Sequence, residues 1–303
     1  PTQTPIQLAT ATKTSAPPTP TATPRVLAER VLIISVDGLR GDLIYPDTMP
    51  NTHALIERGA YAANAYTTFP SSTLPAHASM LTGMCPEKHL VDWNDYLPQK
   101  GYAASPSLFE IAHQTGLQTA MIVGKEKLRQ ITSPENTDIF KFINDRDSIV
   151  VQAAIPHLND NFDLFFIHLP LVDMLGHEYG WLSPNYMIGA FRADEAIGML
   201  LAALNEANLR EGTLILITAD HGGHSGQGAS HGTALPEDMH IPWIASGAGI
   251  HPTIISRPIS TVDTAATVAY ALGLPIPATW DGVPVYEAFG EPAPARVERP
   301  CQP

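Results

Sequence analysis

The sequence predicts a single α/β domain, built as a three-layer α/β/α sandwich around a mostly parallel central sheet. Short apolar runs rich in β-branched residues recur along the chain, as expected of strands buried on both faces. The intervals between these runs are long enough for crossover helices, and several carry apolar residues at helical spacing. A chain of 303 residues can bury one sizeable core of this kind.

The expected strands and helices alternate along the chain. Strands are predicted at 31–36, 117–123, 163–169, 213–219 and 241–245. Helices are predicted at 76–84, 107–115, 185–208 and 261–272. Pro75 suits a first helical turn, and Gly116 and Gly273 suit the ends of two helices.

The two ends of the chain differ from the middle in composition. Residues 1–24 are rich in Thr and Pro and are predicted to form a disordered tether. The catalytic domain is expected at 25–290, followed by a C-terminal tail at 291–303. Because the chain starts with Pro1 rather than Met, we expect a processed product, secreted or tethered at the cell surface. A disordered tail on a cytoplasmic protein is the alternative.

Composition excludes several classes of protein. The net charge of −13 and the absence of a run of Lys and Arg argue against nucleic-acid scaffold binding, which needs a clustered basic face. The sequence contains no run of about 18 apolar residues, so it predicts no transmembrane segment. Cys85 and Cys301 are too few for a disulfide framework, and whether they pair is left open. The sequence does not indicate the oligomeric state.

Carboxylate and imidazole side chains follow three of the expected strands. Asp37 follows the first strand. Asp173 and His177 follow the third, and Asp220 with His221 closes the fourth. The carboxyl ends of parallel strands meet at one edge of a sheet, where ligands bind. Asp and His are typical ligands of divalent cations, so the sequence predicts a metal centre at this edge.

Thr73 lies at the start of a predicted helix, just ahead of Pro75. A hydroxyl in this place lies beside free backbone N–H groups and the positive end of the helix, where phosphate oxygens bind well. Thr73 is therefore a candidate nucleophile, and a plain N-cap is the alternative interpretation.

These motifs resemble, in their order along the chain, the type I phosphodiesterase/nucleotide pyrophosphatase branch of the alkaline phosphatase superfamily. The resemblance runs from residue 31 to about 282 and rests on Asp37-Gly38, Thr73-x-Pro75-x-His77-x-Ser79-x-x-Thr82-Gly83, Pro86-Glu87, His89, Asp173-x-x-Gly176-His177 and Asp220-His221-Gly222. It implies an alkaline-phosphatase-like fold and a hydrolase.

The resemblance also implies two divalent metal ions, with zinc favoured. The ligands of the first ion would come from three parts of the chain: Asp37, Asp220, His221 and the Thr73 oxygen. The second ion would use Asp173, His177 and a later histidine, which His231 matches best. His224 and His240 are weaker candidates for that third ligand.

Asn94 stands where this branch carries an asparagine that hydrogen-bonds a non-bridging phosphate oxygen. Leu90 and Trp93 stand where the family usually has glycine, and a surface-turn role for Asn94 is the alternative. His77 and His168 are interpreted as supporting side chains rather than metal ligands.

The residues and the resemblance together predict an enzyme that cleaves a small-molecule phosphate ester through a phospho-threonine intermediate at Thr73. No base motif flanks Thr73, so coordination to a cation would have to activate its hydroxyl. A phosphodiester or pyrophosphate substrate is favoured by resemblance alone. Phosphomonoesterase and phosphonate hydrolase are alternatives, and a non-catalytic metal- or phosphate-binding module is a weaker one. Cys85-Pro86-Glu87-Lys88 does not match the sulfatase motif, and Ser225 lacks the spacing of a nucleophile elbow.

Overall fold

The computed structural model describes residues 26–104, 106–159, 161–226, 230–293 and 301–302. The predicted tether at 1–24 lies outside these ranges, as does most of the predicted tail at 291–303. Within the described ranges, no helix has both the length and the hydropathy needed to cross a membrane.

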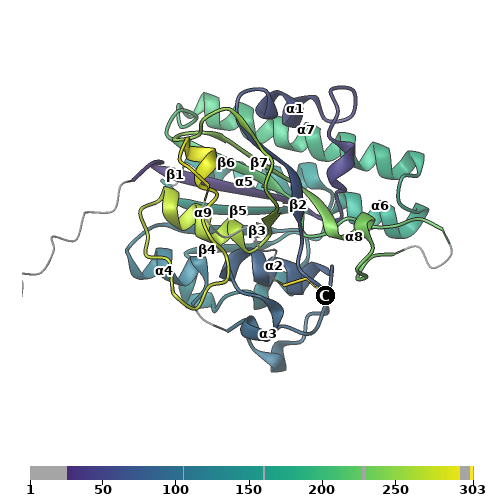
Figure 1. The fold of residues 1–303 in the computed structure, drawn as a ribbon, viewed down its shortest axis with the longest axis horizontal. Coiled ribbons are helices and arrows are strands. Elements are labelled where there is room, and N and C mark those ends of the chain that lie inside the picture. The colour runs from purple at the N-terminus through teal and green to yellow at the C-terminus, as the bar shows by residue number, and fades with distance from the viewer. Residues whose placement is uncertain (1–25, 105, 160, 227–229, 294–300, 303) are drawn as a thin grey trace, which may run out of the picture.

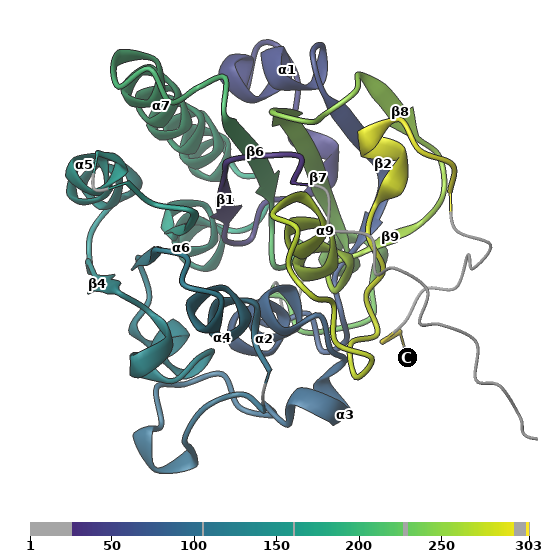
Figure 2. The same ribbon diagram turned by 90° about the vertical axis from the view of Figure 1, so that its left-hand side faces the viewer.

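A central sheet lies between two layers of helices (Figures 1 and 2). In the described chain its order is β4-β3-β5-β1-β6-β7-β2-β8, with β9 paired to β2. All neighbouring strands are parallel except that β7 runs antiparallel to both β6 and β2. The mostly parallel α/β fold predicted from the sequence is thus confirmed. The strands are β1 Arg30–Val36, β2 Ala60–Tyr66, β3 Thr119–Val123, β4 Ile139–Phe142, β5 Leu164–Leu169, β6 Thr213–Thr218, β7 His240–Gly247, β8 Thr253–Ile255 and β9 Ile259–Ser260.

The helices cover both faces of the sheet. Helices α1, α5, α6 and α7 lie on one face, and α2, α4 and α9 lie on the other (Figure 2). Their bounds, with the short helices α3 and α8, are α1 Pro50–Ile56, α2 Thr73–Thr82, α3 Pro86–His89, α4 Leu108–Gln114, α5 Asp147–Leu158, α6 Leu171–Tyr179, α7 Pro184–Glu206, α8 Pro236–Met239 and α9 Asp263–Ala271. Short 3₁₀ helices lie at Gly41–Leu43, Pro98–Lys100, Glu126–Gln130, Pro134–Asn136 and Tyr286–Phe289.

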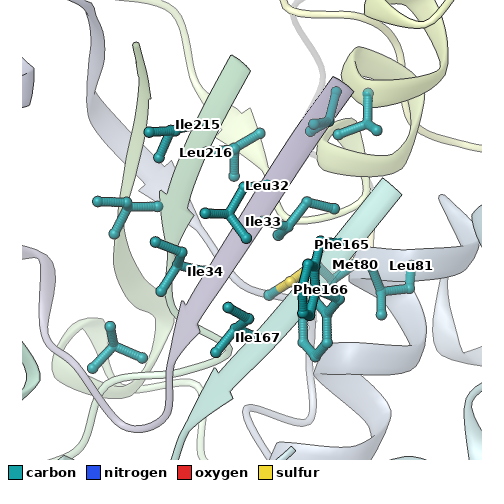
Figure 3. Close-up of a cluster of buried hydrophobic side chains, with 14 of the residues drawn as sticks. Leu32, Ile33, Ile34, Met80, Leu81, Phe165, Phe166, Ile167, Ile215 and Leu216 are labelled. Carbon is teal, nitrogen blue, oxygen red and sulfur yellow. The ribbon is translucent and has the colours of Figure 1, made fainter. Parts of the chain in front are cut away.

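The core lies along β1, β5 and β6, whose side chains are buried on both faces. Figure 3 shows Leu32 of β1 beside Leu216 of β6, and Phe165 of β5 beside Met80 and Leu81 of α2. Each buried side chain of this size contributes about 1.5–3 kcal/mol to folding. The three strands therefore form a stiff platform, and side chains at their carboxyl ends are held in fixed positions.

A disulfide joins Cys85, just before α3, to Cys301 near the C-terminus. The carbonyl of Cys301 accepts a hydrogen bond from the Phe69 N–H at 3.0 Å. Gln302 Nε2 donates to the Thr67 carbonyl at 2.8 Å. The pairing left open by the sequence is therefore made, and it fastens residues 301–302 to the loop that leads into α2.

Candidate functional site

The carboxyl ends of three neighbouring strands bring together Asp37, Asp173 and Asp220. Asp37 directly follows β1, Asp220 lies just after β6, and Asp173 lies in the first turn of α6, which follows β5. All three carboxylates are buried. Gly38, at φ +72°, makes this approach feasible, because a Cβ there would lie only 2.9 Å from the Asp173 Cα.

Each of these buried carboxylates keeps one oxygen without a hydrogen-bond partner in the described chain: Asp37 Oδ1, Asp173 Oδ1 and Asp220 Oδ2. The opposite oxygens are held in place. Asp37 Oδ2 accepts from His168 Nε2 at 2.7 Å. Asp220 Oδ1 accepts from the N–H groups of Gly38 and His221 at 3.1 and 3.0 Å. Leaving a buried acceptor unpaired costs about 1–3 kcal/mol, and more when it is charged, so these oxygens fit a bound cation.

Two histidines present an unprotonated nitrogen to these oxygens. Nδ1 of His221 lies 2.8 Å from the Gly222 carbonyl, and Nδ1 of His231 lies 2.9 Å from the Ser71 carbonyl. Because a carbonyl only accepts, each Nδ1 carries the proton and each Nε2 is free to bind a metal. Burial lowers the pKa of His221. Burial and the neighbouring His221 lower the pKa of His231 to about 4. Both rings are therefore neutral near pH 7, as metal ligation requires.

The ligand-type atoms fall into two groups, in each of which they lie within 4.8 Å of one another. The groups share one carboxylate and comprise Asp37, Asp173 and His221 in one case, and Asp173, His177 and His231 in the other. Asp220 adjoins the first group, with its Oδ2 3.3 Å from His221 Nε2. In the second group, His177 Nε2 lies 3.4 Å from Asp173 Oδ1 and 3.1 Å from His231 Nε2. Asp173 thus lies between the two groups rather than in the second alone.

Thr73 is the first residue of α2, so this helix begins three residues earlier than the predicted start at 76. Its buried hydroxyl lies 3.4 Å from His221 Nε2, which points it toward the first group of ligands. The Thr73 carbonyl accepts from His77 Nδ1 at 2.7 Å, and His77 Nε2 accepts from the Ser35 hydroxyl at 2.8 Å. His77 therefore links the first residue of α2 to Ser35 of β1.

The side-chain oxygen of Asn94 accepts from two donors. The Leu74 N–H lies 2.8 Å away and Lys127 Nζ lies 3.1 Å away. These donors fix the orientation of the amide, since only its oxygen can accept from them. Nδ2 is the remaining polar group of Asn94, and it carries two N–H donors at the positive end of α2.

Two lysines that the sequence did not single out, Lys125 and Lys127, follow β3. Lys125 Nζ lies 2.7 Å from Asp37 Oδ2, 2.5 Å from Asp173 Oδ2 and 3.5 Å from Thr73 Oγ1. Burial opposes the charge of Lys125, but Asp37 and Asp173 outweigh it and raise the pKa of the ammonium. Burial likewise opposes ionisation of Asp37, but Lys125 and His168 hold its pKa well below the usual range.

The remaining histidines do not contribute to the two groups of ligand-type atoms in the described chain. His168 receives the Gly124 N–H at its Nδ1, at 3.2 Å, so its Nε2 carries the proton that it donates to Asp37. His224 Nδ1 lies 2.8 Å from Asp238 Oδ1. His240 Nε2 lies 3.3 Å from the Ala63 carbonyl. Neither His224 nor His240 belongs to the two ligand groups of the described chain.

The sheet order and the polar side chains at its carboxyl edge define an α/β protein with a ligand site at the strand ends. The family model for "Type I phosphodiesterase / nucleotide pyrophosphatase" matches residues 31–267. The chain belongs to this family.

Several curated proteins are similar to part of the chain. A pyrophosphatase/phosphodiesterase of Schizosaccharomyces pombe, itself uncharacterised, is 30% identical over 65% of this chain and 45% of its own. Human ectonucleotide pyrophosphatase/phosphodiesterase family member 1 is 26% identical over 64% of this chain and 24% of its own. GPI ethanolamine phosphate transferase 1 of Saccharomyces cerevisiae is 23% identical over 77% of this chain and 28% of its own. The chain therefore spans less than half the length of these relatives.

Solved structures share the fold. Murine ectonucleotide pyrophosphatase/phosphodiesterase 5, an inactive form in complex with AMP, superposes with a TM-score of 0.72 at 16% identity, covering 86% of this chain and 98% of its own. A phosphonate monoester hydrolase from Silicibacter pomeroyi gives 0.66 at 17% identity, covering 88% and 78%. The alkaline-phosphatase-like architecture expected from the sequence is thus confirmed.

Proposed function

We propose that the protein is a metal-dependent hydrolase of small phosphate esters that works through a phospho-threonine intermediate at Thr73. Its family favours a phosphodiester or pyrophosphate link. The observation that carries the proposal is the place of the Thr73 hydroxyl, 3.4 Å from His221 Nε2 and beside three buried carboxylates with unpaired oxygens. The residues that would hold two divalent cations, with zinc favoured, are Asp37, Asp220, His221 and Thr73 for one and Asp173, His177 and His231 for the other.

The chain's own residues account for the chemistry around the cations. When bound, divalent cations would supply Lewis acidity and lower the pKa of a coordinated hydroxyl. Thr73 Oγ1 attacks phosphorus, its proton passes to solvent, and the bond from phosphorus to the leaving oxygen breaks. Water then attacks the same phosphorus atom and the bond from phosphorus to Thr73 Oγ1 breaks. This oxygen takes up a proton from the attacking water, which restores the hydroxyl and releases the phosphate product. Asn94 Nδ2 and the start of α2 stabilise negative charge on the phosphoryl oxygens during both steps.

Phosphomonoesterase is a second candidate function. It is supported by Lys125, whose ammonium lies 3.5 Å from the Thr73 hydroxyl. A cation there stabilises a phosphoryl group with two negative charges more than one with a single charge.

We also propose an extracytoplasmic location for the protein. The disulfide between Cys85 and Cys301 supports it, because disulfides persist mainly in oxidising compartments.

The test is turnover of bis-p-nitrophenyl phosphate and p-nitrophenyl phosphate by the zinc-loaded protein. Thr73→Ala should lower turnover by about 10³-fold or more while metal content is unchanged. Ser72→Ala is the matched control, since it removes a neighbouring hydroxyl that makes no capping hydrogen bond. Retention of most activity by Thr73→Ala would refute the nucleophile. Zinc-loaded protein without turnover of either ester would favour the binding module.

A further inference from the structure

The two lysines after β3 lie on the side of the site next to Thr73 and Asn94. Lys125 Nζ is 3.5 Å from Thr73 Oγ1, and Lys127 Nζ is 3.1 Å from Asn94 Oδ1. Lys127 lies in the 3₁₀ helix Glu126–Gln130 and Lys125 directly precedes it, while Leu128 and Gln130 of the same helix are buried. The cations are thus placed by ordered backbone rather than by a free loop end.

The surroundings of the two ammonium groups differ. Lys125 lies between Asp37 and Asp173, at 2.7 and 2.5 Å from their oxygens. The only hydrogen bond of Lys127 Nζ within the described residues is to the uncharged amide of Asn94, and no carboxylate there lies within ion-pair distance. A partly buried cation without a counter-anion is costly unless a ligand supplies the negative charge.

A hollow of about 270 Å³ adjoins these groups, and charged side chains of both signs line it together with two amides: Lys125, Lys127, Asp95, Glu126, Asn94 and Asn144. One end of the hollow lies beside the Asn94 amide, which contacts Leu74, and beside the Lys125 ammonium, which contacts Thr73. A substrate attacked by Thr73 can therefore extend into this hollow. The groups that lie at its Thr73 end are Lys125, Lys127 and the amide of Asn94.

We propose that Lys125 and Lys127 form a second anion subsite, which recognises an additional negative charge next to the phosphorus atom attacked by Thr73. That charge belongs either to the second ionised oxygen of a monoester or to the adjoining phosphate of a pyrophosphate link. The inference rests on the proposed function and adds that esters with this extra charge are preferred over simple diesters.

The test compares Lys127→Met with the wild type on three substrates. Bis-p-nitrophenyl phosphate carries one negative charge, p-nitrophenyl phosphate carries two, and ATP carries its extra charge on the adjoining phosphate. Lys127→Met should lower kcat/KM for one or both of the last two by about tenfold to a hundredfold more than it lowers kcat/KM for the diester. A loss confined to the monoester or to ATP identifies which source of charge the subsite reads. Lys127→Arg should restore most of the preference.

Lys100→Met is the matched control, because Lys100 is exposed and pairs with Asp92 at 2.7 Å. Competitive inhibition of diester hydrolysis by inorganic pyrophosphate or phosphate gives a second readout, and the inhibition constant of at least one of them should rise about tenfold or more in Lys127→Met. An equal loss on all three substrates, with the inhibition constants unchanged, would show a merely structural role and overturn the subsite. That result would leave the proposed function unaffected. A Thr73→Ala variant as active as the wild type would instead overturn the proposed function.

Discussion

Two regions of the molecule bury carboxylates in opposite ways. Asp194 of α7 is surrounded by donors from the start of α1. It accepts from the N–H and Nδ2 of Asn51, both at 2.9 Å, and from the N–H and hydroxyl of Thr52 at 2.8 and 2.7 Å. At the carboxyl edge of the sheet, the equally buried carboxylates Asp37, Asp173 and Asp220 each keep an unpaired oxygen. A complete set of donors marks Asp194 as a carboxylate that holds the fold together. Three incomplete sets that converge at one edge of the sheet, beside histidine nitrogens, mark a place built for a ligand.

The largest effect is expected for Asp220→Asn. The amide oxygen can keep the bonds that Oδ1 accepts from Gly38 and His221. The substitution replaces the unpaired Oδ2 with an uncharged amide nitrogen. Zinc content should therefore fall, and turnover of bis-p-nitrophenyl phosphate should drop by about 10³-fold. Burial and the charge of Asp37 raise the pKa of Asp220 well above its usual range. The metal-free variant should therefore unfold in EDTA at the same temperature as wild type or higher. A marked loss of metal-free stability would contradict the comparison.

The opposite result is expected at the α1–α7 contact. Asp194→Ala removes four hydrogen bonds to a buried carboxylate. The free energy of unfolding should fall by about 3–4 kcal/mol, measured by urea denaturation. Zinc per folded chain should be unchanged. Loss of metal by Asp194→Ala, like that expected of Asp220→Asn, would erase the distinction between the two regions.

A smaller loss of stability is expected at the disulfide. Cys301→Ser opens the link to Cys85 and frees residues 301–302 from the loop before α2. Unfolding free energy should fall by about 2–4 kcal/mol, with turnover at 25 °C within about twofold of wild type. Reduction of the wild type should reproduce the loss. An unchanged unfolding curve after reduction would show that the link contributes nothing to stability.

The smallest effect on activity is expected for Asp147, a buried carboxyl away from the ligand groups. Its Oδ1 accepts from the Leu171 N–H at 3.0 Å, and its Oδ2 has no partner in the described chain. Burial raises the pKa of Asp147 to about 7. The folded state then holds the proton above the unfolded pKa of about 3.9, so this stabilising contribution is complete below about pH 4 and is lost as the pH rises through 7.

Asp147→Asn keeps an acceptor for Leu171 and removes the titration. It should nearly match the wild type at pH 4 and exceed its unfolding free energy by about 4 kcal/mol at pH 8. Asp47→Asn, at an exposed carboxylate, is the control. Equal unfolding curves for Asp147→Asn and wild type at both pH values would contradict this account of Asp147.

Much of the architecture was predictable because apolar runs mark buried strands and polar residues mark their carboxyl ends. The direction of β7 was not, since an apolar run reads the same for a parallel and an antiparallel strand. β2 and β4 were missed because the sequence AYAANAY of β2 lacks β-branched residues and β4 has only four residues. The start of α2 was placed too late because Pro75 was read as the sign of its first turn.

The sequence predicts those residues of the candidate site that are typical metal ligands, namely aspartate and histidine. It does not predict the residues that act through charge complementarity. Lys125 and Lys127 follow a predicted strand, just as Asp37 does, but lysine is not among the residue types that indicate a metal site. The same rule about strand ends, applied to every charged side chain, would have found them. The free oxygen of Asp147 depends on packing between α5 and the start of α6, which no local pattern reveals.

The central claim is that the side chains at the carboxyl edge of the sheet form a metal centre. It is tested most directly by the zinc content of the purified protein, measured by mass spectrometry after dialysis against zinc and then against metal-free buffer. Two zinc ions per chain are predicted for the wild type, and fewer than one for Asp173→Asn, which lies between the two ligand groups. A folded wild-type protein that retains no metal, or an Asp173→Asn variant that retains both ions, would contradict the account.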